Sequence, residues 1–247
     1  WFGYGKARSF NFNGSDAKVV FVGSEIDRGP HSGNGITLNG ENSRYVVSNS
    51  KIFSRSYYIS NNVDPDIMGY CISVKGGLDV VIKNNFFEKA HSQGNVFRVK
   101  SHNLIISPSV GKVSIFNNIF LESNHPLISA PFGASITNNH SVTSNTSVVG
   151  GAVALHTTTG DPAFVDGDPY KLSEGSPLID AGTEDPRYND RDGSRNNIGP
   201  SGGSWYDPEG WTTEKPVVIS FDLLPDSVLE GVDTKVTIEG VRAVSKP

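Results

Sequence analysis

The sequence predicts an all-β chain wound into a solenoid, in which short strands recur coil after coil. Three observations predict this fold class. Apolar and polar residues alternate over short runs in positions 1–160, and no sustained helical period is found there. Four of these runs end in the same asparagine-containing corner. All 21 asparagines lie at or before Asn197, so asparagine marks one part of the chain.

Length and composition limit the class of protein. The chain has 247 residues, of which 36% are hydrophobic and 10% aromatic, which is enough for a real core and too apolar for disorder. The single cysteine, Cys71, excludes an intrachain disulfide and a cysteine-built zinc site. No apolar run is long enough to span a membrane. The net charge of −5, without a Lys/Arg cluster, excludes nucleic acid as a predicted partner.

The asparagine corners define the repeat. The corner runs are Tyr45–Phe53, Val80–Phe87, Val113–Phe120 and Ala134–Asn139, with Asn49, Asn84, Asn117 and Asn138 spaced 35, 33 and 21 residues apart. We predict a second strand after each corner, at Tyr70–Val74, Val96–Val99, Leu127–Ala130 and Val153–Leu155, and an earlier coil from Lys18–Val22 and Gly35–Leu38. Asparagine tolerates left-handed backbone and can form ladders between coils. The alternative is an antiparallel sandwich, whose hairpins would not repeat the corner in phase.

Two groups of motifs carry a resemblance. The Ile-x-Asn-Asn-x-Phe corners are one, and the other is a run in positions 161–199 that contains Asp161-Pro-Ala-Phe, Gly175-Ser-Pro-Leu-Ile-Asp180-Ala-Gly182, Asp190-Arg-Asp192-Gly-Ser-Arg195 and Ile198-Gly199. Both resemble right-handed parallel β-helix proteins of the secreted or cell-surface type. The resemblance implies an extracellular or cell-surface location and a C-terminal cap over the open end of the coils. Phe164, Leu172, Leu178 and Ile179 would supply the plug.

We therefore divide the chain into three parts: parallel β-helix coils in 1–160, an acidic capping segment in 161–209, and a β extension in 210–247. The coils hold 13 basic and 9 acidic residues, a net charge of +4, while the cap holds 4 and 11, a net charge of −7. This polarity would orient head-to-tail contacts between subunits or attract an anionic glycan to the coils.

The β extension alternates like two strands, Lys215–Phe221 and Lys235–Val241. So few residues do not make an independent domain. The strands either pair with the coils or another subunit, or begin a truncated immunoglobulin-like module.

A cationic group is the first candidate site. Aligning the second strands places Thr37, Ser73 and Arg98 in one outward column and Asn39, Lys75 and Lys100 in the next. A resemblance to β-helix polysaccharide lyases implies Lys100 as the catalytic base, Arg98 as the group that neutralises a uronic carboxylate, and Lys75 as their cationic neighbour. Asp64 and Asp66 would be calcium ligands. The alternative is a set of solvated surface charges.

Aromatic and acidic side chains supply two further candidate sites. Tyr57, Tyr58 and Tyr70 flank a long loop and could stack on sugar rings. Asp190 and Asp192 are two residues apart with Gly193 beside them, so they could hold a structural calcium; salt bridges to Arg187 or Arg195 are the alternative. We expect Trp205 and Trp211 to pack the cap against the C-terminal strands.

Three remaining residue types have simpler expectations. Cys71 is predicted to be a buried or half-buried thiol. The histidines lack metal-ligand spacing, so His140 is predicted to lie in a loop or at the surface. Asn13, Asn139 and Asn145 begin glycosylation sequons, which chance alone explains in so asparagine-rich a chain.

Two function classes follow. The first is a non-enzymatic structural or adhesive module, such as an adhesin or filament subunit, or a carbohydrate-binding module. The alternative is a lyase-like enzyme acting on uronic-acid glycans through Lys100 and Arg98. The predicted partners are a polysaccharide or neighbouring subunits, with no cofactor or a structural calcium. The coils lack the acidic cluster of calcium-dependent lyases, which favours the non-enzymatic class, although the fold alone does not decide.

Overall fold

The computed structural model describes residues 2–7, 9–27, 34–53, 70–88, 104–121, 127–143, 147–208, 217–224 and 235–241. Apart from a short 3-10 helix, η2 (Pro186–Tyr188), every described element is a strand. The all-β prediction is therefore confirmed for the described residues.

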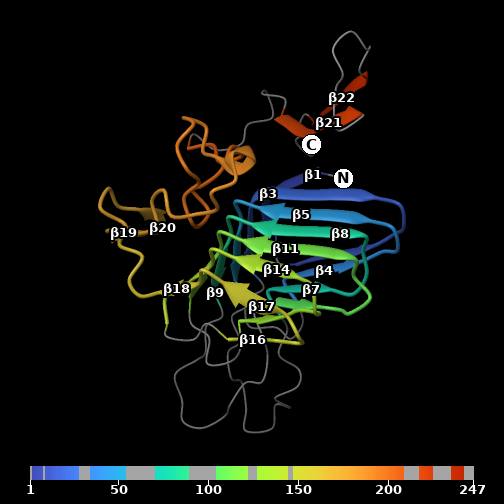
Figure 1. Ribbon diagram of the computed structural model, residues 1–247, viewed down its shortest axis with the longest axis horizontal. Coiled ribbons are helices and arrows are strands. Elements are labelled where there is room, and N and C mark those ends of the chain that lie inside the picture. Colours follow the sequence, from blue (N-terminus) through green and yellow to red (C-terminus); the bar gives the residue numbers. More distant parts are fainter. Residues whose placement is uncertain are drawn as a thin grey trace, which may run out of the picture.

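Two sheets form the body of the molecule (Figure 1). The twelve-stranded sheet contains β1 (Phe2–Ala7), β3 (Lys18–Asp27), β5 (Arg44–Ser48), β6 (Lys51–Phe53), β8 (Asp79–Lys83), β9 (Phe86–Glu88), β11 (Lys112–Phe116), β12 (Ile119–Leu121), β14 (Ser135–Thr137), β15 (His140–Ser141), β17 (Val153–Leu155) and β18 (Thr158–Thr159). The six-stranded sheet contains β2 (Phe10–Asn13), β4 (Ile36–Asn39), β7 (Ile72–Val74), β10 (Leu104–Ile106), β13 (Ile128–Ser129) and β16 (Val148–Val149).

All strand pairs in both sheets are parallel. The antiparallel sandwich is therefore excluded, and the architecture is a parallel β-solenoid, compatible with a β-helix. Each coil passes through the six-stranded sheet, then a first arm of the larger sheet (β5, β8, β11, β14, β17), then a second arm (β6, β9, β12, β15, β18). The two arms share β3, whose first half pairs with β5 and second half with β6.

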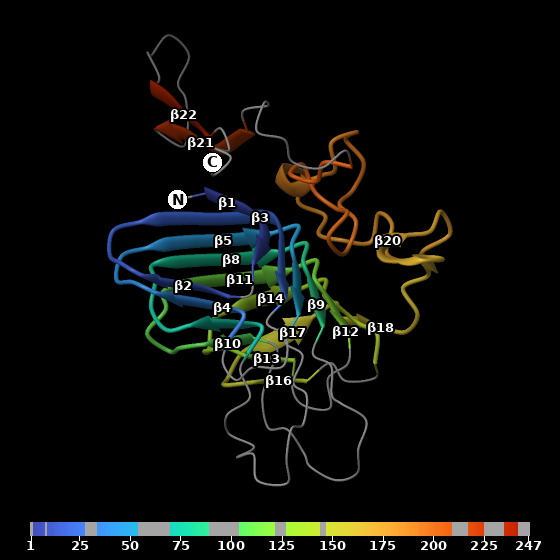
Figure 2. The ribbon, with the colours of Figure 1, turned by 180° about the vertical axis from the view of Figure 1, so that it is seen from behind.

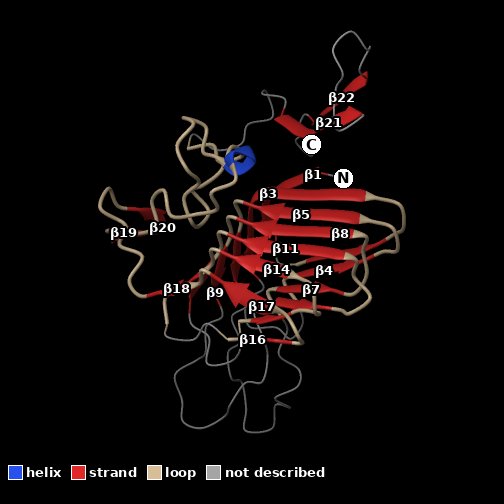
Figure 3. Ribbon diagram, viewed as in Figure 1, coloured by secondary structure: helices blue, strands red, loops and turns tan. Residues whose placement is uncertain are grey.

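Each coil thus has three strands, where the sequence predicted two. The short strands that directly follow the corners were not predicted as separate elements, and neither were β1 and β2. Figure 3 shows how the corner divides each pass through the larger sheet into two short strands. Each corner occupies only two residues between the two strands, so the sequence pattern was interpreted as one run and not as two strands.

Two predicted second strands are in the wrong place. The strand that pairs with β7 is β10, at Leu104–Ile106, where the sequence predicted Val96–Val99. Val153–Leu155 is β17, in the first arm next to Ser135–Thr137, and the six-stranded sheet instead continues with β16. Connections of variable length precede these strands, and short apolar triplets do not fix a register on their own.

The core lies between the sheets and is built from stacked inward side chains. Val19, Tyr45, Val80 and Val113 form one such row, and all are buried. Cys71 is also fully buried, as predicted.

His140 is buried rather than exposed, which corrects the prediction for this residue. Its Nδ1 lies 2.9 Å from Thr158 Oγ1 and its Nε2 lies 3.0 Å from the Gly160 carbonyl oxygen. Burial lowers the pKa of His140. The imidazole therefore ties β15 to the following coil.

Each corner has two neighbouring positions with different roles. The sequence analysis assigned both roles, the left-handed backbone and the ladder between coils, to asparagine without separating the positions. The first, at Asn49, Asn84, Asn117 and Asn138, has a positive φ of 50–57°, which is the left-handed conformation that asparagine tolerates. The second forms the ladder: Asn118 Oδ1 accepts hydrogen bonds from Asn85 N and Nδ2, both at 3.0 Å, and Asn139 Oδ1 accepts from Asn118 N and Nδ2. Asn139 is buried in this ladder, so its sequon is closed to glycosylation in the folded chain.

The closing segment, residues 161–208, lies along the asparagine corners (Figure 2). It contains a hairpin of β19 (Phe164–Val165) and β20 (Asp168–Leu172), followed by η2. The corner asparagines bond to this segment in order. At the later coils, Asn138 Nδ2 donates to the Gly182 carbonyl and Asn117 Oδ1 accepts from Thr183 N. At the earlier coils, Asn84 Nδ2 donates to the Asn197 and Gly199 carbonyls, and Asn49 Nδ2 donates to the Pro200 and Gly202 carbonyls. The segment thus runs back from the later coils to the earlier ones.

This path corrects the prediction that the segment plugs the open end of the coils. The second arm presents apolar side chains outward, and these form a second core with the closing segment. Its buried members are Phe53, Phe86, Ile119, Leu172, Leu178 and Ile198, with Phe164 and Tyr170 packed against them. Leu172, Leu178 and Phe164 therefore pack as apolar residues on the flank of the coils, whereas Ile179 is 37% exposed.

The C-terminal extension forms two strands, as predicted. β21 (Val217–Leu224) pairs antiparallel with β22 (Lys235–Val241) in a two-stranded sheet of its own. Neither strand joins the larger sheets among the described residues.

Candidate functional site

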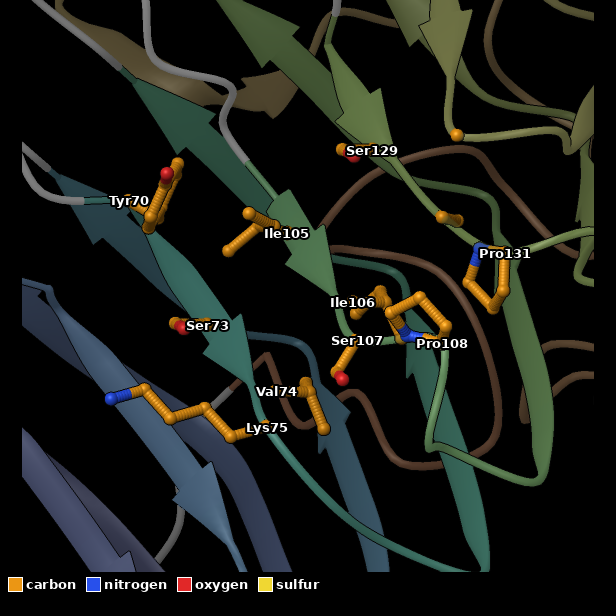
Figure 4. Close-up of a pocket in the computed structure, with 12 residues that line it drawn as sticks. Tyr70, Ser73, Val74, Lys75, Ile105, Ile106, Ser107, Pro108, Ser129 and Pro131 are labelled. Atoms are coloured by element: carbon orange, nitrogen blue, oxygen red, sulfur yellow. The ribbon is translucent and has the colours of Figure 1, made fainter.

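The outer face of the six-stranded sheet carries a hollow of about 390 Å³ (Figure 4). It crosses β7, β10 and β13 and reaches the turn after β16. Tyr70 lies at one end and Pro131 at the other. The lining includes Tyr70, Ser73, Lys75, Ile105, Ser107, Pro108, Ser129 and Pro131.

Strand alternation places these side chains outside. Ile72, Leu104 and Ile128 share a register position and are buried, so their successors Ser73, Ile105 and Ser129 point outward as neighbours. The row therefore places a hydroxyl, an apolar side chain and a second hydroxyl on adjacent strands. Ser73 is only 4% exposed, whereas Ile105 and Ser129 are half-buried.

Hydrogen bonds fix the two rims of the hollow. Tyr70 N donates to Asn34 Oδ1 at 3.0 Å, and the Tyr70 carbonyl accepts from Gly35 N at 2.9 Å. On the other rim, Ser109 Oγ donates to the Lys75 carbonyl at 2.9 Å. The backbone beneath Tyr70 and Lys75 is thus held by the neighbouring coils.

Lys75 is exposed and gives the hollow its charge. No other charged residue is found in the described lining. Its neighbours along the column are Asn39, by the pairing of β4 with β7, and Ser107, whose N–H donates to the Val74 carbonyl. Within the described part of the chain, no carboxylate forms an ion pair with Lys75. An anionic group could therefore reach the ammonium without displacing a partner.

The predicted site residues divide into two groups. Tyr70 and Lys75 lie on the hollow. Arg98, Lys100, Tyr57, Tyr58, Asp64 and Asp66 lie outside the described residues. The predicted alignment of Arg98 and Lys100 with Ser73 and Lys75 is wrong, because Ile105 is the register partner of Ser73 and Ser107 follows on the same strand path. Their roles in catalysis stay predictions.

Asp190 and Asp192, the predicted calcium ligands, accept hydrogen bonds from their own segment. Asp190 Oδ1 accepts from Asn197 N at 3.3 Å and from Gly203 N at 2.5 Å, and burial raises its pKa. Asp192 Oδ1 accepts from Ser194 N and Oγ, and these hydrogen bonds lower its pKa. The described residues contain no group of three His, Cys, Asp or Glu placed to hold a metal. The calcium stays a prediction.

Lys83 is a residue that the sequence analysis did not single out. It ends β8 and is buried beneath the closing segment, with Nζ 5.1 Å from the centre of the Tyr188 ring and 4.6 Å from that of Trp205. Burial lowers the pKa of Lys83 to about 8. Trp205 thus packs on the coils; its expected contact with the C-terminal strands stays a prediction.

The contacts of Lys83 fasten the closing segment and leave no room for a substrate, so we assign it to structure. A lysine at an outward strand position normally indicates a surface residue, and the only signal to the contrary was the cluster of aromatic residues near the end of the closing segment. The hollow is the better candidate for binding, because it combines a tyrosine, hydroxyls and a lysine that has no ion-pair partner among the described residues.

No described helix has the length and apolar character needed to cross a membrane. Comparisons of the chain with protein-family models, with curated proteins and with solved structures found no match.

Proposed function

We propose that this chain is a right-handed parallel β-helix module of the secreted or cell-surface type that binds carbohydrate, preferably acidic, without acting on it chemically. The observation that carries the proposal is the hollow on the six-stranded sheet, whose lining combines Tyr70 and Lys75 with the hydroxyls of Ser107 and Ser129.

Each part of the hollow suits one feature of a sugar. An aromatic ring and the apolar surfaces of Ile105 and Pro108 suit the apolar face of a pyranose, since tyrosine combines an apolar body with a polar edge. The half-buried Ser107 and Ser129 can donate to or accept from sugar hydroxyls. Lys75 would pair with the carboxylate of an acidic sugar.

The lining favours binding over catalysis. Lys75 and Tyr70 are the titratable side chains in the described part of the hollow, and no carboxylate or histidine faces them there. A general acid–base reaction needs a group placed to take a proton and a second group to stabilise the charge that develops.

The alternative remains a lyase acting on uronic-acid glycans through Lys100 and Arg98. One observation supports it: Arg98 and Lys100 precede β10 in the sequence, and Ile105 and Ile106 of β10 line the hollow. Formation of unsaturated uronic products, followed by ultraviolet absorbance with and without calcium, tests this alternative. Activity that is lost in Lys100→Ala would replace binding by catalysis as the proposed function.

Glycan affinity tests the main proposal. The full chain is titrated with acidic polysaccharides (polygalacturonate, alginate) and with neutral ones by calorimetry or affinity electrophoresis. We expect Lys75→Ala to weaken binding of the acidic glycans about fivefold, because an exposed ion pair contributes up to about 1 kcal/mol. Tyr70→Ala should weaken acidic and neutral glycans alike.

Lys112→Ala is the matched control. Lys112 is also exposed but begins β11, on the first arm, so its removal changes the net charge by the same amount at another place. Equal losses in Lys75→Ala and Lys112→Ala, or a panel in which no glycan binds, would overturn the proposal.

A further inference from the structure

The last two coils are uncharged. Residues 123–160, which contain β13 to β18, include no Asp, Glu, Lys or Arg. The earlier coils differ: their first-arm strands begin with Lys18, Arg44, Asp79 and Lys112. Such a change of surface chemistry along one repeating architecture needs a physical reason.

The same end exposes large apolar side chains. Val153 and Leu155 of β17 are 69% and 55% exposed, and Phe132, in the turn between β13 and β14, is 90% exposed. Val149 of β16 is 38% exposed. Ala154 shares a register position with the buried Ile136, so Val153 and Leu155 point outward from the last coil, next to its open strand edge. Exposed apolar groups that cluster in this way mark interaction surfaces.

Backbone groups at this end also lack partners among the described strands. β16, β17 and β18 are the terminal strands of their sheets. The Leu155 carbonyl accepts from Asn138 N at 3.1 Å, so Leu155 faces the preceding coil and, by strand alternation, the N–H and C=O of Ala154 face the open side. Such edges are normally protected by charge, proline or a bulge.

The larger sheet has such protection at the opposite end. There β1 pairs with β3 and contains a register shift between Gly3 and Gly5, which is a β-bulge or similar irregularity. Head-to-tail stacking would join the open edge to this protected one. A contact between two copies of the open end avoids pairing an open strand edge with a protected one.

We propose that the end coil, residues 147–160, is the surface through which two copies of this chain form a closed, two-fold dimer. In such an interface each patch meets itself, so a patch without charged residues brings no like charges together. A two-fold axis also makes the facing strand edges antiparallel, a geometry in which strands pair readily.

The dimer would bring two hollows close together. Pro131 and Gly150 line the hollow and belong to the last two coils, so each hollow extends to the proposed interface. If the hollow binds glycan as proposed above, one long glycan could occupy both copies and bind with higher avidity. The dimer itself does not depend on glycan binding.

Sedimentation of the full chain over a concentration series tests the proposal. We expect a monomer–dimer equilibrium, and we expect Leu155→Glu to raise the dimer dissociation constant by about 100-fold, because symmetry places the substituted side chain in the interface twice. Leu78→Glu is the matched control, since Leu78 is 48% exposed in the middle of the stack and should leave the equilibrium unchanged.

Ala154→Pro is a second variant, because it removes an N–H that faces the open side and spares the bonds to β14. Circular dichroism and a melting curve show that each variant is folded. A wild type that stays monomeric, equal effects of Leu155→Glu and Leu78→Glu, or open-ended filaments in electron micrographs would overturn the two-fold dimer. Monomeric Leu155→Glu that still binds glycan in a Lys75-dependent way would separate this proposal from that of the binding site.

Discussion

The two flanks of the coil stack are both built from parallel strands, but one is covered by the closing segment and the other carries the hollow. Along the asparagine corners, the outward side chains Phe53, Phe86 and Ile119 are apolar, and the closing segment covers them. On the six-stranded sheet, Ser73 and Ser129 alternate with Ile105, and a hollow remains. The chemistry of the outward positions therefore decides which flank is structural and which is accessible.

Two lysines show the same contrast. Lys83 and Lys75 both extend outward from parallel strands, yet Lys83 is buried between two aromatic rings and Lys75 is exposed. A buried cation lowers stability unless its surroundings compensate, whereas an exposed one costs little and stays available to a ligand. Substitutions on each flank should therefore separate stability from binding.

The largest expected effect is on the covered flank. Leu178→Ala should lower the free energy of unfolding by about 3 kcal/mol, because Leu178 is 2% exposed in the second core and its truncation leaves a cavity. Chemical denaturation measures this change.

Ile179→Ala is the control for Leu178→Ala. Its side chain is next in the sequence but 37% exposed, so the loss should stay below about 1 kcal/mol. Equal losses in the two variants would mean that the closing segment does not cover this flank as described.

These two neighbours also show which parts of the fold the sequence could predict. Leu178 and Ile179 are adjacent apolar residues in a motif of the closing segment, so pattern alone assigned both to a plug. The corners and the first-arm strands that precede them were predictable because asparagine and apolar alternation repeat in phase. The path of the closing segment was not, because it depends on carbonyl groups that the corner asparagines recognise, and backbone acceptors leave no mark in a sequence.

The candidate site was predictable in part for a similar reason. Tyr70 and Lys75 lie on either side of β7, a strand that the repeat located correctly. Ile105 and Ser107 were missed because two apolar triplets, Val96–Val99 and Leu104–Ile106, compete for one position, and only tertiary packing chooses between them.

The second effect concerns Lys83 and pH. Its pKa is about 8 when folded, against 10.5 for an unperturbed lysine, so the unfolded chain holds the proton more tightly between these values. The contribution of Lys83 is fully present above pH 10.5 and is lost as the pH falls through 8. From pH 7 to 9.5 the free energy of unfolding should therefore rise by about 2 kcal/mol.

Lys83→Met removes the titrating group and keeps a side chain of similar length. Denaturation of both proteins at pH 7 and 9.5 isolates the effect of Lys83, since the other groups titrate in both. A wild type with the same pH dependence as Lys83→Met would show that the aromatic rings compensate the buried charge completely.

The smallest effect on stability is expected on the open flank. Lys75→Ala should change the free energy of unfolding by less than about 0.5 kcal/mol, because Lys75 is exposed and forms no ion pair among the described residues. The measurement is the same denaturation series at pH 7. A loss of 2 kcal/mol or more, on the order of a broken buried contact, would show that Lys75 supports the fold, and its effect on glycan affinity would then no longer report on the hollow alone. With stability unchanged, any loss of glycan affinity in Lys75→Ala is a property of the binding surface.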